Sequence, residues 1–248
     1  MHLTCYQTTH IGARQSNQDS FGFDARDNWG CFVVADGLGG HYRGEIASQF
    51  VTQSLIKLAP KFASAIETDP MLGMKDFVSQ AISKAQKDII KKYQEVDTQT
   101  TIAIAWLNQD HFIAAHVGDS RIYKLNKQAV IWRTPDHTQV QALFEQGKIT
   151  EAVFSTHPLQ NQLLRSICTY EPPEVDIVVQ PPLASNESLV LCTDGFWSGC
   201  EPEDFIKLSR NHGSTEKKVS DLIDRILKQQ GEDCDNITVQ VVKSLPTL

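Results

Sequence analysis

A strand of buried type that runs directly into Asp-Gly occurs twice in this chain, and no other feature constrains the fold as strongly. Residues 32–41 read FVVADGLGGH and residues 189–195 read LVLCTDG. Continuous apolar runs of this kind are typical of strands that are covered on both faces. One strand that ends in Asp-Gly is ordinary turn chemistry. The repeat favours a need for the charges of Asp36 and Asp194 at the rim of the core.

Two more aspartates stand at predicted strand ends, which brings the set to four. Asp119 follows AAHVG, and Asp235 lies just before the strand that contains ITV. If the four strand ends meet at one end of packed sheets, their carboxylates repel one another strongly unless protons or cations neutralise them. Oxygen ligands with few histidines or cysteines nearby favour the hard cations Mg²⁺ or Mn²⁺. Gly37 would let the backbone approach closely and offer its own carbonyl as a further ligand.

A second signal is the polar stretch RQSNQD at residues 14–19, in the predicted turn between the first two strands. Taken alone, Arg14 reads as a solvated loop residue. If the turn lies beside the aspartate cluster, its planar guanidinium is the group best suited to hold a phosphate bidentately against the metals. Asp19 would then hydrogen-bond a metal-bound water.

Composition narrows the class of protein and its partners. The 248 residues, 41% hydrophobic and 21% charged, are sufficient for one large domain with its own core. A net charge of −7 without a Lys/Arg cluster longer than a pair argues against a nucleic-acid partner. The six cysteines are scattered, so we expect reduced thiols rather than a zinc site. The first residues do not resemble a signal peptide, and no apolar run approaches the roughly 20 residues that span a bilayer. We therefore expect a cytoplasmic protein with no membrane partner, and a monomer.

Hydrophobic periodicity predicts an α+β layered sandwich rather than alternating βαβ units. Two long amphipathic helices are expected in succession, one over about 43–58 and one that includes 78–89, and a third includes 219–227. Between 136 and 165 the pattern loosens into two short helical stretches, which predicts an excursion over the surface. Strands are predicted at 3–8, 20–24, 30–35, 101–107, 111–117, 121–125, 130–132 and 237–242.

Other motif interpretations are weaker. GLGGHY after a strand faintly resembles a dinucleotide fingerprint, but Tyr42 stands where glycine or alanine is required, and Asp36 would repel a pyrophosphate. The chain contains no P-loop sequence and no HExxH pair. Ser120 is not in a nucleophile elbow, because Ile122 takes the place of the second glycine. We interpret the histidines as surface or structural residues.

The order of the motifs closely resembles the metal-dependent protein phosphatases of the PPM, or type 2C, family in their compact bacterial form. The resemblance covers essentially the whole chain. Its specificity comes from seven short motifs in the family's order. These are RxxNQD at 14–19, VVADGLGGH at 33–41, TT at 100–101, VGDSR at 117–121, DHT at 136–138, CTDG at 192–195 and DNIT at 235–238.

The resemblance implies a four-layer αββα sandwich with a centre of two Mn²⁺ or Mg²⁺ ions, and a third in bacterial members. By this resemblance Asp36 bridges both core metals, and the carbonyl of Gly37 serves one of them. Asp194 and Asp235 hold the other metal, and Asp119 with Asp194 matches the third site. Arg14 falls on the phosphate-binding arginine. A single domain, 1–248, is implied, with a mobile flap at about 140–161.

Two positions depart from the animal members of the family. Gln18 stands where those carry glutamate, as is usual in the bacterial form. Leu38 stands where they carry the histidine proposed as general acid. We expect a metal-bound water to donate the proton here, with His41 as the alternative.

The resemblance implies a phosphatase that hydrolyses phosphoserine and phosphothreonine in proteins, which are targets of a Ser/Thr kinase. A hydroxide that bridges the metals would attack the phosphorus directly, with Arg14 and the cations neutralising the phosphoryl oxygens. One alternative is a metal-dependent hydrolase of small phosphate esters. Another is a catalytically silent member that binds phosphoproteins, which would be expected to lose metal ligands that this chain retains.

Overall fold

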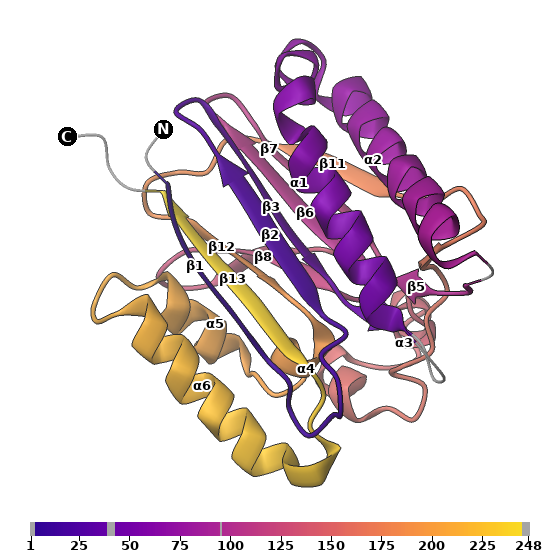
Figure 1. Ribbon diagram of the computed structural model, residues 1–248. Coiled ribbons are helices and arrows are strands. Elements are labelled where there is room, and N and C mark those ends of the chain that lie inside the picture. Colours follow the sequence, from indigo (N-terminus) through magenta and orange to yellow (C-terminus); the bar gives the residue numbers. More distant parts are fainter. Residues whose placement is uncertain (1–2, 39–42, 95, 245–248) are drawn as a thin grey trace.

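Two antiparallel sheets packed face to face form the centre of the molecule (Figure 1). The computed structural model describes residues 3–38, 43–94 and 96–244. Sheet A has the order β1 (Leu3–His10), β13 (Ile237–Ser244), β12 (Ser188–Cys192), β8 (Arg121–Leu125) and β9 (Val130–Arg133). Sheet B has the order β11 (Asp176–Gln180), β7 (Phe112–Val117), β6 (Ile102–Asn108), β3 (Trp29–Ala35) and β2 (Ser20–Ala25).

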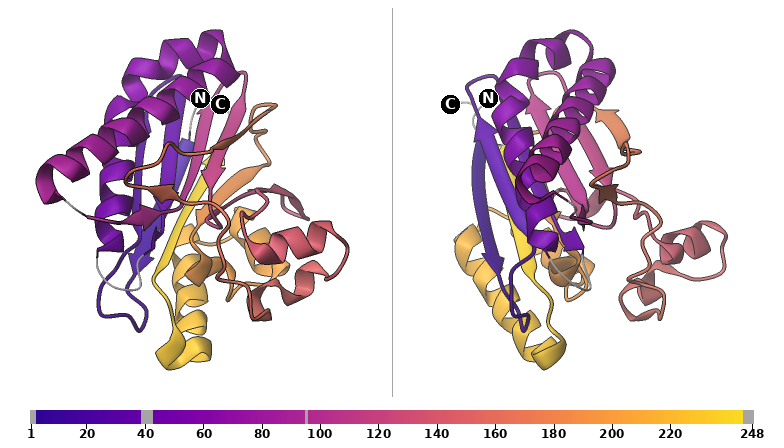
Figure 2. Two further views of the ribbon diagram at one scale, coloured as in Figure 1. Left: turned by 90° about the vertical axis from the view of Figure 1, so that its right-hand side faces the viewer. Right: turned by 45° about the vertical axis from the view of Figure 1, so that its right-hand side comes forward.

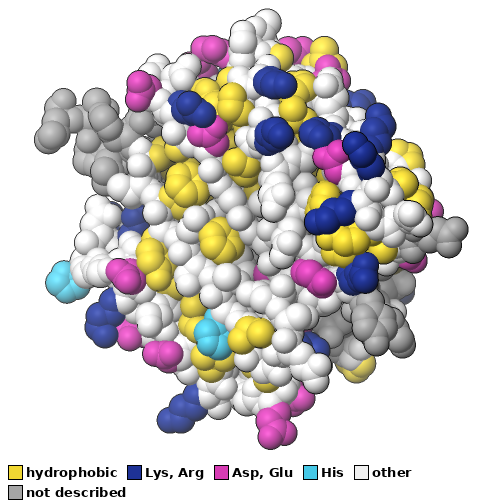
Figure 3. Space-filling model, in the orientation of Figure 1, with side chains coloured by type: hydrophobic (Ala, Val, Ile, Leu, Met, Phe, Trp, Pro, Cys, Tyr) yellow, Lys and Arg dark blue, Asp and Glu magenta, His cyan; other side chains and the backbone are white. Residues whose placement is uncertain are grey.

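Helices cover the outer face of each sheet, so the predicted four-layer αββα sandwich is confirmed (Figures 1 and 2). The helices α1 (Gly44–Thr68) and α2 (Pro70–Tyr93) lie on sheet B, and α5 (Pro202–Ser209) and α6 (Thr215–Gln230) lie on sheet A. Many Lys and Arg side chains gather over α1 and α2 (Figure 3), as expected for the solvent face of amphipathic helices. Within the described ranges, no helix combines the length and apolar character that a bilayer span requires.

The first helix is longer than its predicted range of 43–58. It continues through Pro60 to Thr68, although proline removes a backbone donor from a helix interior. Packing explains the difference, because Ala59 and Ile66 are both fully buried in the core beneath α1 and α2. The turn to α2 is closed by Asp69, whose side chain accepts a hydrogen bond of 3.0 Å from the N–H of Leu72.

The core explains why β3 shows no alternation of apolar and polar residues. Cys31, Val33 and Ala35 pack toward the helices on sheet B. Phe32 and Val34, which alternate with them, belong to the layer between the two sheets. Both faces of the strand are therefore buried, and its far end delivers Asp36 to the edge of the sandwich.

A small third sheet lies beside that edge, formed by β10 (Ile167–Cys168), β5 (Gln99–Thr100) and β4 (Gly37–Leu38). The stretch from 138 to 163 leaves the body of the molecule (Figure 2) and contains α3 (Gln139–Glu145) and the 3₁₀ helix η1 (Glu151–Thr156). Its two ends meet in an isolated β-bridge between Thr138 and Leu163. The short helices contact each other through Phe144 and Phe154, with ring centres 5.5 Å apart.

Candidate active site

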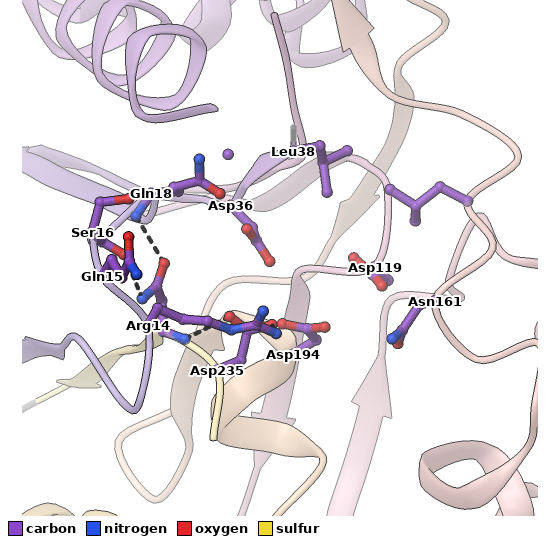
Figure 4. Close-up of a pocket in the computed structure, with 13 residues that line it drawn as sticks. Arg14, Gln15, Ser16, Gln18, Asp36, Leu38, Asp119, Asn161, Asp194 and Asp235 are labelled. Atoms are coloured by element: carbon purple, nitrogen blue, oxygen red, sulfur yellow. Dashed lines mark hydrogen bonds and ion pairs between the residues drawn. The ribbon is translucent and has the colours of Figure 1, made fainter. Parts of the chain in front are cut away.

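A cavity of about 320 Å³ opens at the end of the sandwich where β3 and β12 finish. Five of the charged residues singled out in the sequence line it, and their side chains surround one space (Figure 4). The lining residues are Arg14, Gln15, Ser16, Gln18, Asp36, Gly37, Leu38, Asp119, Asn161, Leu163, Asp194, Asp235 and Asn236. The structure therefore brings together the four aspartates that the sequence placed at strand ends.

The backbone of Asp36 is fixed by the two threonines of the TT motif. Its N–H donates to the hydroxyl of Thr101 at 3.0 Å. Its carbonyl accepts from the hydroxyl of Thr100 at 2.7 Å and from the N–H of Thr101 at 2.9 Å. The carboxylate of Asp36 thus leaves a strand end that has little freedom to move.

Close backbone contact explains the glycine that follows. A Cβ atom on Gly37 would lie 2.4 Å from the carbonyl oxygen of Gly44, and a Cβ on Gly44 would lie 2.5 Å from the carbonyl oxygen of Gly37. Both obstacles are backbone atoms, which cannot rotate away. The start of α1 is therefore pressed directly against the wall of the cavity.

Asn236 joins the N-terminal turn to the C-terminal strand. Its Nδ2 donates to the carbonyls of Ile11 at 2.8 Å and Ser16 at 3.0 Å, and its Oδ1 accepts from the N–H of Gln18 at 2.8 Å. These three bonds hold the turn that carries Arg14 beside Asp235. The role of Asn236 was not predicted, although its place in the DNIT motif was the available signal.

Asp119 is held by a stack of buried side chains. The indole N–H of Trp197, at the end of α4 (Asp194–Trp197), donates to the carbonyl of Asp119 at 2.9 Å. The guanidinium carbon of Arg121 lies 3.4 Å from the centre of the Trp197 ring. Arg121 in turn binds both carboxylate oxygens of Asp136, at 2.8 and 2.6 Å.

The electrostatics of the cavity disfavour four ionised carboxylates without bound cations. Burial raises the pKa of Asp36 well above its usual range, and the surrounding carboxylates raise it further. Burial likewise raises the pKa of Asp119 well above its usual range and that of Asp194 to about 6. The Oδ1 atom of Asp194 is buried without a hydrogen-bond partner.

Arg14 is the one Lys or Arg among the described residues that line the cavity. Its Nη2 lies 3.0 Å from Oδ2 of Asp235, and both side chains are partly exposed. One guanidinium balances only one of the four carboxylates. The donor set is made of oxygen atoms and needs further positive charge, which fits hard divalent cations such as Mn²⁺ or Mg²⁺.

Three other positions that the sequence analysis discussed have different surroundings. Asp19 is buried away from the cavity lining, where its Oδ2 accepts from the hydroxyl of Thr193 at 2.9 Å and burial raises its pKa to about 7. Leu38 lines the cavity and offers no proton. No histidine lines it among the residues that the structure describes, and His41 lies outside them.

A cluster formed by His116, His137 and Asp176 has the composition of a metal site but a different hydrogen-bond pattern. Nδ1 of His137 accepts from the N–H of Gly118 at 3.1 Å, so its proton is on Nε2, which lies 3.2 Å from Asp176. Both nitrogens of His137 are therefore used by the protein. Asp176 is also bound by both Nη atoms of Arg165, at 2.8 and 3.2 Å. This cluster links the ends of the 138–163 stretch to the loop that carries Asp119.

Comparison with known proteins shows which proteins this chain resembles. The family model "Protein phosphatase 2C" matches residues 6–236. The serine/threonine phosphatase stp of Listeria welshimeri is 32% identical over 246 residues, which cover 96% of this chain and 94% of that protein. The crystal structure of the serine/threonine phosphatase PstP/Ppp of Mycobacterium tuberculosis has a TM-score of 0.81 at 25% identity and covers 98% of this chain and 99% of that one. The catalytic domain of PstP in complex with two manganese ions shares the fold, with a TM-score of 0.75 at 24% identity, 98% coverage of this chain and 99% of that one.

Proposed function

The chain belongs to the protein phosphatase 2C family in its bacterial form and is a protein serine/threonine phosphatase, and we propose a mechanism for it. In this mechanism, water attacks the phosphorus of phosphoserine or phosphothreonine directly. The observation that carries the mechanism is the surplus of carboxylates in one cavity, with a single guanidinium among the described lining residues. Two Mn²⁺ or Mg²⁺ ions, when bound there, supply a hydroxide at neutral pH and neutralise phosphoryl oxygens.

The proposed ligands are those that the resemblance to the family implies, and all of them line the cavity. Asp36, at the end of β3, feels the charges of Asp119, Asp194 and Asp235 and would bridge the two core ions. The carbonyl of Gly37 would serve one ion, and Asp194 and Asp235 the other. Asp119, with Asp194, would take a third and weaker ion. Asp19 already accepts a hydrogen bond from Thr193, which precedes Asp194 in the chain. From this position it would orient a water near Asp194.

Arg14 has a second task in this scheme. In the structure its guanidinium is paired with Asp235, which is one of the proposed metal ligands. If Asp235 held a cation, the guanidinium of Arg14 would be free to donate to two phosphoryl oxygens of the substrate. Charge that develops on those oxygens in the transition state is then stabilised by a donor that is already in place.

The remaining assignments are proposals of the same kind. A water in the cavity would protonate the leaving alkoxide, because Leu38 offers no proton. The stretch at about 140–161 would act as a flap, since Asn161 lies on the cavity wall. The substrates would be phosphoproteins that a Ser/Thr kinase has modified. The phosphatase would be a cytoplasmic monomer with one domain, 1–248. It would have neither nucleic acid nor a membrane as partner.

Hydrolysis with and without metal tests the mechanism. A phosphothreonine peptide, an aryl phosphate and a nucleotide are assayed in parallel with the purified protein. We expect turnover of the peptide to vanish in excess chelator and to return when Mn²⁺ is added. Full activity in chelator would overturn the mechanism. A nucleotide hydrolysed faster than the peptide would favour the alternative of a small-ester hydrolase.

A further inference from the structure

Two lysine ammonium groups converge on one backbone carbonyl at the end of sheet A that is remote from the cavity. Nζ of Lys218, in α6, lies 2.5 Å from the carbonyl oxygen of Arg210, and Nζ of Lys243 lies 3.3 Å from the same atom. Lys243 is near the end of β13, whereas Asp235 just precedes its start (Figure 1). At about 3.4 Å per residue, the strand places this pair roughly 25 Å from the cavity.

Among the residues that the structure describes, no carboxylate balances the positive charge at this place. Neither Lys218 nor Lys243 forms an ion pair with any carboxylate in the part of the chain that the structure describes. Burial and the charge of Lys218 lower the pKa of Lys243 to about 8. Burial and the charge of Arg210 also lower the pKa of Lys218. A carbonyl oxygen has only a partial charge, so it cannot compensate two ammonium groups.

A third polar group beside the lysines lacks a partner. Ser188 is directly opposite Lys243 in the ladder between β12 and β13, so both side chains leave the same face of sheet A. Its side chain is 1% exposed, and its hydroxyl has no hydrogen-bond partner. A buried hydroxyl that is left unpaired destabilises the folded state, so a ligand that accepts its proton would be favoured.

The position of the carbonyl explains part of this arrangement, because Arg210 caps the C-terminus of α5 and cations are favourable there. That effect accounts for one lysine. It accounts neither for the second ammonium group nor for the unpaired hydroxyl of Ser188. An anion bound by the two ammonium groups would balance their charge, and Ser188 leaves the same face of the sheet beside Lys243 to donate to it.

We propose that Lys218, Lys243 and Ser188 form a binding site for inorganic phosphate or a phosphomonoester group. Two ammonium groups match a dianion, and the hydroxyl supplies a third hydrogen bond to a phosphate oxygen. A monovalent carboxylate would leave one ammonium unbalanced. The site stands on its own charges and contacts, and it does not depend on the proposed reaction.

Titration calorimetry of the chelator-treated protein tests the site, because the metal-free cavity is acidic and repels phosphate. We expect saturable binding of inorganic phosphate to the wild type. Lys218→Met and Lys243→Met should each weaken it by at least about tenfold, the effect of losing a charged hydrogen bond. Ser188→Ala should cause a smaller loss. Lys217→Met is the matched control, since that lysine is exposed on the same helix and paired with Asp221 at 3.3 Å, and it should bind phosphate as the wild type does.

Two results would overturn the proposal. One is the absence of saturable phosphate binding to folded wild-type protein. The other is binding that survives the double change Lys218→Met/Lys243→Met but disappears in Arg14→Ala, which would place the anion in the cavity. O-phosphoserine titrated in parallel identifies the source of the anion. Equal binding indicates a phosphomonoester, and binding of inorganic phosphate alone indicates the free ion. Neither substrate nor metal is present, so failure here leaves the proposed hydrolysis untouched.

Discussion

The cavity and the ion pair of Arg121 with Asp136 behind it are both buried and both charged, but only the ion pair balances its own charges. In the cavity, four carboxylates face one partly exposed guanidinium, and Asp194 keeps an unpartnered oxygen. Behind it, Arg121 and Asp136 form a two-bond ion pair whose side chains are 6% and 2% exposed. A protein of marginal stability keeps unbalanced buried charge only where a ligand restores the balance. The imbalance therefore points to the cavity as the candidate active site, and the balanced pair is its structural support.

The two regions are physically joined. Trp197 donates to the carbonyl of Asp119 and stacks against Arg121. The support thus fixes one wall of the cavity while contributing no charge to it. Substitutions in the cavity should lower activity without lowering stability. Substitutions in the support should mainly lower the free energy of unfolding.

The largest effect is expected from Asp36→Ala. Turnover with Mn²⁺ should fall by roughly a thousandfold or more, as when one member of a catalytic unit is lost. In chelator the variant should be at least as stable as the wild type, because one of several repelling carboxylates is gone. Steady-state kinetics and thermal unfolding measure the two effects. A variant that keeps its turnover, or that unfolds more easily without metal, would erase the distinction between the regions.

The next largest effect is expected from Arg121→Met, which removes both hydrogen bonds to the buried carboxylate of Asp136 and leaves it only the longer contact of 3.9 Å with Nη1 of Arg133. The free energy of unfolding should fall by about 3–5 kcal/mol, as measured by urea denaturation. Arg26→Met is the matched control, because its partner Asp24 lies at 2.8 Å in an exposed pair and such pairs contribute at most about 1 kcal/mol. Equal losses in the two variants would show that the buried pair does not support the cavity.

The contrast between these regions also separates what the sequence could predict from what it could not. Strand ends followed by Asp-Gly were visible because a strand and its turn are local in sequence. The ion pair of Arg121 and Asp136 was not predicted, although both residues lie in recognised motifs, because side-chain pairing depends on how β8 and the following loop pack. Asn161 and Leu163 reach the cavity wall only through the bridge that closes the 138–163 stretch. The short edge strand β11 was also missed, because its five residues show no clear alternation and its place in the sheet depends on pairing with β7.

A third effect concerns the pH dependence of the metal-free protein. Burial raises the pKa of Asp194 from 3.8 to about 6 and that of Asp19 to about 7, so the folded state holds protons that the unfolded chain has lost. Stability should therefore be greatest near pH 4 and fall as the pH rises through 6 and 7. A shift of two pKa units corresponds to roughly 3 kcal/mol.

Thermal unfolding in chelator from pH 4 to pH 8 measures this slope, and Mn²⁺ added at pH 8 should restore stability. Unfolding temperatures that rise with pH in chelator would mean that the cavity carboxylates are already balanced within the protein. The cavity would then resemble the balanced ion pair of Arg121 and Asp136.

The smallest effect is expected from Arg14→Lys, which keeps the charge but loses the planar fork. The value of kcat/KM should fall by roughly 10- to 150-fold, equivalent to about 1.5–3 kcal/mol. Metal affinity should be retained, because lysine still faces Asp235. Much of the loss should appear in KM if the guanidinium holds substrate and transition state alike. Wild-type kcat/KM and phosphate inhibition in both Arg14→Lys and Arg14→Ala would make Arg14 a solvated loop residue.

The pairing of β1 with β13 has a consequence for the newly synthesised chain. In the described sheet β1 has β13 as its neighbour, and Asn236 holds the turn that carries Arg14. The N-terminal strands leave the ribosome long before β13, since chains emerge at roughly 5–20 residues per second. Contacts this distant in sequence also form slowly. On the proposed mechanism, a growing chain would lack the Asp235 side of the cavity until β13 pairs with β1, so hydrolysis would begin only after that pairing.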